Sequence, residues 1–156
     1  MSNQGEFAVP KEKQRVTVHL TGGEEKTGNI FLEFFPDVQT LHQKISAFLE
    51  DAARFFPLAA DGAGPEFISK GSIRMLAVDS PDDAPAFNLM HIEDITATFT
   101  DGTTLSGEFL AEVPKEKARL SDCLNLHETF LSVKKENRIY YVNKSAIQKV
   151  VYTKPA

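Results

Sequence analysis

VTVHLTGGEEKTGNIFLE (residues 16–33) decides the fold, because the chain repeats its pattern 79 residues later as ITATFTDGTTLSGEFLAE (95–112). The two stretches align without a gap. In each one, apolar and polar residues alternate before and after a glycine-containing turn, GGEEKTG or DGTTLSG. Alternation with a period of two is typical of a half-buried β-strand, and glycine supplies the positive φ angles of a tight turn. Each stretch therefore predicts a β-hairpin.

A second match shows that more of the chain is repeated. FISKGSIRMLAV (67–78) aligns without a gap on YVNKSAIQKVVY (141–152), now 74 residues later, and places Lys70 over Lys144. A repeat of this length indicates a duplicated structural unit. The predicted fold class is mainly β with some α, as two tandem five-stranded small β-barrels formed by internal duplication.

One shorter identity lies outside this repeat. The pentapeptide VPKEK occurs at 9–13 and again at 113–117. The first copy precedes its hairpin, whereas the second follows the second strand of its own hairpin. We interpret the pentapeptide as a coincidence beside the true duplication.

The two copies differ between the hairpin and the last strands. Apolar residues recur at helical spacing over 38–56, which predicts an amphipathic helix of about four turns. The corresponding 118–133 is shorter and predicts one or two turns, then a strand at 130–133. A Pro- and Asp-rich stretch, 79–94, separates the copies and is typical of a linker. The predicted organisation is a tail at 1–14, a first module at 15–78 with its helix at about 38–54, a linker at 79–91 and a second module at 92–156.

Composition and charge restrict the classes of protein to which the chain can belong. The sequence has 156 residues, one cysteine and a formal net charge of −5. It contains no apolar run near the roughly 18 residues that a membrane span requires, and its first fifteen residues lack the apolar segment of a secretory signal. We therefore expect a cytoplasmic protein that has no intrachain disulfide and does not bind membranes. Its net charge opposes non-specific attraction to nucleic acid.

The repeated motifs resemble those of the Sm-like small β-barrel family. The second motif of that family runs hydrophobic–Arg–Gly–x–x–Ile, and VNKSAI (142–147) and ISKGSI (68–73) match its spacing. The first motif is represented by TDGTTLSGEFLAEV, and more loosely by TGGEEKTGNIFLEF. RLSDCLN (119–125), followed by FLSV, also resembles a group of uncharacterised bacterial Sm-like domains in which a short Arg-Leu-Ser-Asp helix precedes the third strand. The resemblance covers most of 15–78 and 93–152.

RNA binding is one function that the resemblance implies. RNA-binding members of the family carry an Asp and an Asn after the second strand, and an Arg-Gly pair before the last strand. Here those loops read VPKEKAR and FPDVQT, and the Arg-Gly positions hold Asn143-Lys144 and Ser69-Lys70. RNA binding through these four residues is the alternative hypothesis, with the lysines contacting phosphate and Ser69 and Asn143 donating hydrogen bonds.

The last strand of each copy has apolar side chains on both faces. A small barrel buries only one face of such a strand, so the other face must pack on the second module or on another chain. We expect the two modules to pack on each other, and association with a second copy of the chain or with another protein stays open. The predicted interface residues are Ile73, Met75, Leu76, Val78, Ile147, Val150, Val151 and Tyr152.

Reactive and metal-binding residue types form no convincing cluster. Cys123 lies four residues before His127, but it is flanked by leucines on the face expected to be buried, which is typical of a structural cysteine. The four histidines have no tight metal-ligand spacing; the best cluster is His91 with Glu93, and two unlike ligands make a poor zinc site. Asp79, Asp82 and Asp83 lack the Gly and Glu of a calcium loop, and no nucleotide-binding or nucleophile-elbow motif is present.

These observations favour a non-catalytic binding or assembly module without a cofactor, a metal or catalytic residues. RNA binding is the second hypothesis. An enzyme that uses Cys123 or His91 is a third, and it has the least support.

Overall fold

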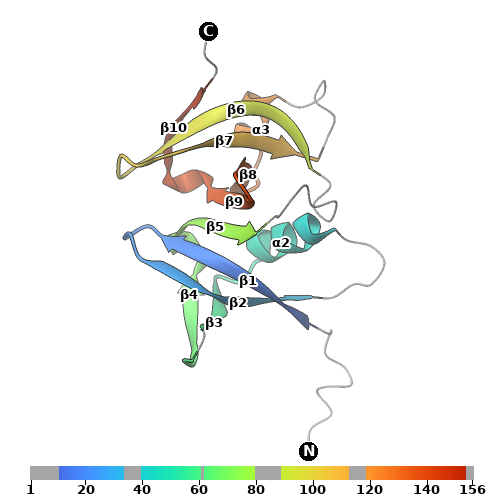
Figure 1. The fold of residues 1–156 in the computed structure, drawn as a ribbon, viewed down its shortest axis with the longest axis vertical. Coiled ribbons are helices and arrows are strands. Elements are labelled where there is room, and N and C mark those ends of the chain that lie inside the picture. Colours follow the sequence, from blue (N-terminus) through green and yellow to red (C-terminus); the bar gives the residue numbers. More distant parts are fainter. Residues whose placement is uncertain (1–10, 34–39, 61, 80–88, 113–118, 154–156) are drawn as a thin grey trace, which may run out of the picture.

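The computed structural model describes residues 11–33, 40–60, 62–79, 89–112 and 119–153, and Figure 1 shows their arrangement. Within these residues, ten strands form one antiparallel sheet. In chain order the elements are β1 (Lys11–Leu20), β2 (Glu25–Glu33), α2 (Leu41–Glu50), β3 (Phe55–Ala60), β4 (Pro65–Ser69), η1 (Lys70–Ser72), β5 (Ile73–Asp79), β6 (Met90–Phe99), β7 (Thr104–Ala111), α3 (Leu120–Asn125), β8 (Phe130–Lys135), β9 (Arg138–Asn143), η3 (Lys144–Ala146) and β10 (Ile147–Tyr152).

The strand order shows that both halves are built alike. The sheet runs β10-β6-β7-β8-β9-β5-β1-β2-β3-β4. The first half therefore reads fifth, first, second, third, fourth strand, and the second half reads in the same order. The halves join where β5 pairs with β9, from Met75↔Val142 to Asp79↔Arg138. This leaves β10 and β4 as the two edges of the sheet, one in each half (Figure 1).

The mainly β class predicted from the sequence is confirmed, but the prediction of barrels needs correction. The sheet is open rather than closed, because β5 pairs with β9 of the other half and not with β4. Strands also reach into the stretches predicted as tail and linker, since β1 begins at Lys11 and β6 at Met90. The first VPKEK copy is only partly within the described residues, and the second lies outside them.

Two glycines allow the hairpins to approach the next strand of their own half closely. A Cβ added to Gly28 would lie 2.7 Å from the carbonyl oxygen of Ala59, and one added to Gly107 would lie 2.5 Å from that of Lys134. No larger residue fits at either position without moving the backbone. The glycines aligned between the two copies in the sequence therefore have the same role in each half.

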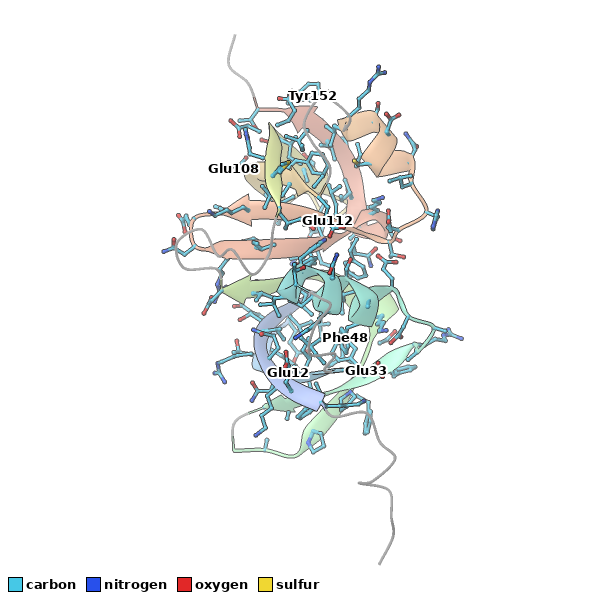
Figure 2. All side chains as sticks on the ribbon, turned by 90° about the vertical axis from the view of Figure 1, so that its right-hand side faces the viewer. Glu12, Glu33, Phe48, Glu108, Glu112 and Tyr152 are labelled. Atoms are coloured by element: carbon cyan, nitrogen blue, oxygen red, sulfur yellow. The ribbon has the colours of Figure 1, made fainter. Side chains whose placement is uncertain are left out.

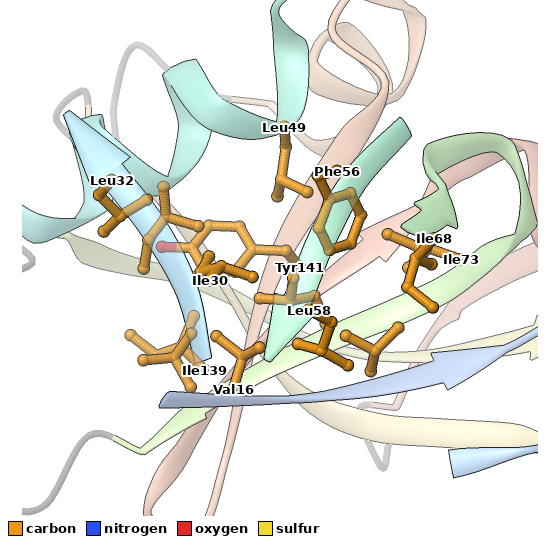
Figure 3. Packing of buried hydrophobic residues seen from close by; sticks show 14 of the residues in the cluster. Val16, Ile30, Leu32, Leu49, Phe56, Leu58, Ile68, Ile73, Ile139 and Tyr141 are labelled. Atoms are coloured by element: carbon orange, nitrogen blue, oxygen red, sulfur yellow. The ribbon is translucent and has the colours of Figure 1, made fainter. Parts of the chain in front are cut away.

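Two hydrophobic cores flank the junction strands. The first core lies under α2, and Figure 3 shows Tyr141 and Ile139 of β9 among residues of the first half such as Leu49 and Phe56. Val142, the residue that follows Tyr141 on β9, faces the other way and belongs to the second core. β5 is divided similarly, because Leu76 and Val78 are in the first core whereas Met75 packs against the second. The apolar residues predicted on both faces of β5 are thus satisfied within the chain.

The helices differ in length as expected, although α2 is shorter than predicted. α2 begins with a capping box, in which the Thr40 hydroxyl accepts from the N–H of Gln43 and the Gln43 side chain accepts from the N–H of Thr40. Ile45 and Leu49 face the first core. The helix ends at Glu50, six residues before the end of the helical spacing, because Phe56 belongs to β3 instead. α3 is a single short helix, as expected.

Candidate functional site

The helix of the first half packs against the second half at the junction. The carboxylate of Glu50, the last residue of α2, accepts hydrogen bonds from the backbone N–H of Thr129 at 2.9 and 3.0 Å and from that of Phe130 at 3.1 Å. These donors lie where the chain enters β8. A carboxylate that accepts backbone N–H bonds forms charge-assisted hydrogen bonds, which are stronger than neutral ones. α2 is therefore held to the second half by its C-terminal end.

Two further contacts fix the N-terminal half of α2 to the second half. The His42 ring nitrogen Nδ1 lies 3.0 Å from the hydroxyl of Tyr141, and the two rings are stacked. Gln43 donates from Nε2 to a carboxylate oxygen of Glu112 at 3.2 Å. Figure 2 shows Glu112 at the boundary between the halves, next to the helix. Burial lowers the pKa of His42, with Glu112 opposing this, and burial raises the pKa of Tyr141.

Each half contains a cleft where its second and third strands diverge. β2 pairs with β3 only at Gly28↔Ala60 and Asn29↔Ala59, so the rest of these strands separates beside the helix. The first cleft, about 560 Å³, is lined by α2 together with β2 and β3. The second cleft, about 210 Å³, lies at the corresponding place between β7 and β8.

The strands that line the two clefts correspond, but the two clefts differ in which halves of the chain supply their walls. Strand register shows the correspondence, because Phe55 pairs with Ser69 as Phe130 pairs with Asn143. His42 and Ser46 of α2 form part of the wall of the second cleft, so residues of both halves line it. All described lining residues of the first cleft come from the first half. α2 thus forms a wall of each cleft, and the described walls of the second cleft come from both halves.

The lysines predicted to contact RNA hold the ends of the helices. Lys70 Nζ donates to the carbonyl of Phe48 and to the carboxylate of Asp51, both at 2.6 Å. Lys144 Nζ donates to the carbonyl of Cys123 at 2.6 Å and to that of Leu126 at 3.3 Å. Cations at helix C-termini satisfy carbonyls that have no partner within the helix. This shared role explains why a lysine stands at the same place in both halves.

Their two neighbours in the sequence are also placed by local structure. Asn143 is buried, donates from Nδ2 to the carbonyl of Ile73 at 2.9 Å and accepts from the N–H of Ser145. Ser69 precedes η1 and makes no capping hydrogen bond with its side chain. Burial lowers the pKa of Lys144, although the nearby Glu128 opposes this. A phosphate would have to compete with the intramolecular bonds of both lysines, and the RNA hypothesis stays a prediction.

The eight predicted interface residues fall into two groups. Those of β5 are in or against the two cores, at the junction with β9. Those of β10 lie at an edge of the sheet, where Val151 is 49% exposed and Tyr152 is 57% exposed. The opposite edge, β4, presents Phe67, which is 69% exposed. Exposed apolar side chains on both edges of a sheet are a common feature of strands that pair with another chain.

The remaining reactive residues do not converge. Burial raises the pKa of Cys123, which disfavours the nucleophilic thiolate, and His127 is exposed. His91 Nε2 lies 2.8 Å from a carboxylate oxygen of Asp94, on β6. Within the described ranges, no group of three or more His, Cys, Asp or Glu residues could hold a metal ion. Asp79 pairs with Arg138 at 3.2 Å, while Asp82 and Asp83 lie outside the described residues.

Sequence reasoning missed the contact of α2 with the second half. His42, Ser46 and Glu50 recur every four residues and so lie on one face of the helix, beside the face that carries Ile45 and Leu49. That second face was a signal for a further packing partner. The backbone groups that receive Glu50 leave no mark in the sequence.

Comparison with known proteins adds no assignment. No family model matches the chain, and no curated protein or solved structure is significantly similar to it. Among the described residues, no helix is both long and apolar enough to cross a membrane.

Proposed function

We propose that this protein is a non-catalytic assembly module, built from two Sm-like, barrel-like units that arose by duplication, and that its chains join edge to edge. The observation that carries the proposal is the pairing of β5 with β9, the last strand of one half with the fourth strand of the other. β10 is the last strand of the second half and so corresponds to β5, and β4 is the fourth strand of the first half and so corresponds to β9. Both β10 and β4 lie at sheet edges. The chain therefore offers the same two surfaces to a second copy that its own halves use with each other.

The register inside the chain predicts the register between chains. Adding 74 to each β5 residue and subtracting 74 from its β9 partner converts Leu76↔Tyr141 into Val150↔Phe67. The same arithmetic converts Ala77↔Tyr140 into Val151↔Glu66. An exposed Phe67 would then be covered by the apolar edge of the next chain. Pro65, at the start of β4, has no N–H to donate, so the ladder is expected to centre on residues 66–68.

Such pairing is heterologous, since a β4 edge meets a β10 edge. Heterologous interfaces produce closed rings when the rotation between neighbours closes, and open filaments when it does not. The assembly is therefore expected to grow beyond a dimer. Until the ring closes, the chain at each end of the assembly would keep one unused edge.

The test compares two substitutions at one exposed position of β10. Val151→Glu places a carboxylate opposite Glu66 of the neighbouring chain, whereas Val151→Lys places an ammonium there. We expect Val151→Glu to raise the dissociation constant about tenfold, because like charges directly opposite each other are unfavourable and about 1.4 kcal/mol corresponds to a factor of ten. Val151→Lys should associate like the unchanged protein.

Light scattering coupled to size exclusion measures both variants over a range of concentrations, and circular dichroism checks that each is folded. Reversal of the loss by Glu66→Lys in a partner chain would identify the predicted pair of residues. A protein that stays at 17.3 kDa at every concentration would contradict the proposal.

A further inference from the structure

The second cleft shows what the first cleft is shaped to receive. In the second half, the helix of the adjoining unit lies across the cleft, and a carboxylate at its end accepts from the N–H groups of Thr129 and Phe130. By strand register, these two donors correspond to the N–H groups of Arg54 and Phe55 in the first half. Among the described residues, no side chain accepts a hydrogen bond from either N–H group.

The N–H of Phe55 is directed toward the first cleft. The backbone N–H of Lys70 donates to the carbonyl of Arg54 at 2.9 Å, so the backbone polar groups of Arg54 point toward Lys70. Along an antiparallel strand these groups alternate in direction, and those of Phe55 therefore point away from β4. The ring of Phe55 lines the cleft and is 58% exposed. A polar donor and an apolar wall thus lie side by side, as they do where α2 packs on the second half.

The direction of assembly decides which helix meets this cleft. Within the chain, the unit that contributes its fifth strand, β5, also contributes the helix that covers the cleft of its neighbour. Between chains, the unit that contributes its fifth strand, β10, carries α3. We infer that α3 of a second copy packs across the first cleft, in the way that α2 packs across the second. This inference rests on the proposed edge-to-edge assembly.

The residues of α3 fit that position. Lys70 bonds to the carbonyl of Phe48 as Lys144 bonds to that of Cys123, which aligns the two helices. In this alignment Ser121 corresponds to Ser46 and Asn125 to Glu50. Both Ser121 and Asn125 are exposed. Asn125 donates from Nδ2 to the carbonyl of Ser121 at 2.7 Å, which leaves the amide oxygen of Asn125 in the second copy to accept from the N–H of Phe55 in the first copy.

A cross-linking experiment with two separately purified variants tests the contact. Both variants carry Cys123→Ala, so that no native thiol remains; one also carries Asn125→Cys and the other Arg54→Cys. They are mixed and treated with a short bismaleimide. We expect a cross-link between the two variants, at a yield well above that of a control mixture in which Arg54→Cys is replaced by Glu24→Cys, at the far end of the β1–β2 hairpin.

Light scattering of the same mixtures distinguishes the two possible failures. Assembly without a specific cross-link would overturn the placement of α3 and leave the proposed function standing. Absence of assembly would overturn both.

A second variant tests the chemistry of the contact. Asn125→Glu installs the carboxylate that Glu50 supplies in the second cleft, and we expect it to tighten association about tenfold, as a charged acceptor is stronger than a neutral one. Asn125→Leu should weaken association, because it removes the acceptor. Equal association constants for these variants and the unchanged protein would contradict the inference. So would occupation of the first cleft by a small carboxylic acid, such as octanoate, without any effect on assembly.

Discussion

The two halves share one strand order but make different use of their helices. The ten-residue α2 fills its own core with Ile45 and Leu49 and also contacts the other half, whereas the six-residue α3 leaves Ser121 and Asn125 exposed. The clefts beside them differ accordingly, at about 560 Å³ in the first half and about 210 Å³ in the second. The difference teaches that the same strand order can support two different helix arrangements. The asymmetry between the halves lies in their helices, because α2 contacts the other half of the same chain.

The largest expected effect breaks the core that the two halves share. Tyr141 belongs to β9 but is only 1% exposed within the core of the first half. Tyr141→Ala should lower the free energy of unfolding by about 4 kcal/mol, since large aromatic-to-alanine changes in a core cost about 3–5 kcal/mol. Thermal or urea unfolding followed by circular dichroism measures the change.

Tyr140, its half-buried neighbour on β9, provides the control, and Tyr140→Ala should cost clearly less. Equal losses from the two substitutions would mean that the first core does not depend on the second half. That result would mean that the stability of the first half does not depend on the second half.

A smaller effect compares the two lysines that hold the helix ends. Lys70 is buried and bonds to a carbonyl and a carboxylate, whereas Lys144 bonds to two carbonyls, one of them at 3.3 Å. Replacement by Met keeps the length of the side chain but removes its charge. We expect Lys70→Met to cost about 2 kcal/mol and Lys144→Met about 1 kcal/mol, because a lost charged hydrogen bond leaves its partners unsatisfied.

Urea unfolding measures both, and the exposed Lys149→Met should be close to neutral. A larger loss for Lys144 than for Lys70 would show that α3 depends on its lysine more than α2 does. The comparison also bears on tests of the RNA hypothesis. If a lysine is needed for folding, its substitution cannot separate a loss of RNA binding from a loss of structure.

The smallest expected effect is a dependence of stability on pH at the junction. Burial lowers the pKa of His42, which faces Tyr141 of β9 and Glu112 after β7. As the pH falls below the ordinary value of 6.5, the unfolded chain takes up a proton at this residue more readily than the folded chain. The contribution of His42 to stability is therefore present above pH 6.5 and is lost toward acid.

Unfolding free energies should fall less between pH 7 and pH 5 in His42→Gln than in the unchanged protein, because the variant lacks the group whose pKa burial lowers. The exposed His127→Gln is the matched control. His19, whose pKa is also lowered by burial, should leave part of the acid dependence in place. Identical pH profiles for His42→Gln and the unchanged protein would contradict the assignment.

Local patterns in the sequence were sufficient for the strands and hairpins. The alternation that begins at Ile95 places buried residues at every second position up to Phe99, whereas Val16, Thr17 and Val18 are all buried. Gly28 and Gly107 fit closely against the next strand. The helix was overestimated because Phe56 fits a helical spacing and also a strand alternation. Periodicity cannot separate these two readings over a single residue.

Partners far apart in the sequence were beyond such patterns. Apolar residues on both faces of β5 indicated a second packing surface, but nothing in them specified β9 rather than another chain. The bond from Glu50 to the N–H groups of Thr129 and Phe130 spans 79 and 80 residues and ends on backbone. Every residue except proline carries a backbone N–H donor, so no residue type in the sequence could indicate this contact.

The pairing of β5 with β9 also has a consequence for synthesis of the chain. β5 is complete at Asp79, while β9 begins only at Arg138, so the first half leaves the ribosome with an unsatisfied strand and an incomplete core that lacks Tyr141. Domains form in the order of synthesis, and unpaired strands that wait for later segments are prone to misassembly. Two nascent chains on one messenger could exchange their C-terminal halves, and the product of that exchange would be an intertwined dimer rather than the monomeric sheet.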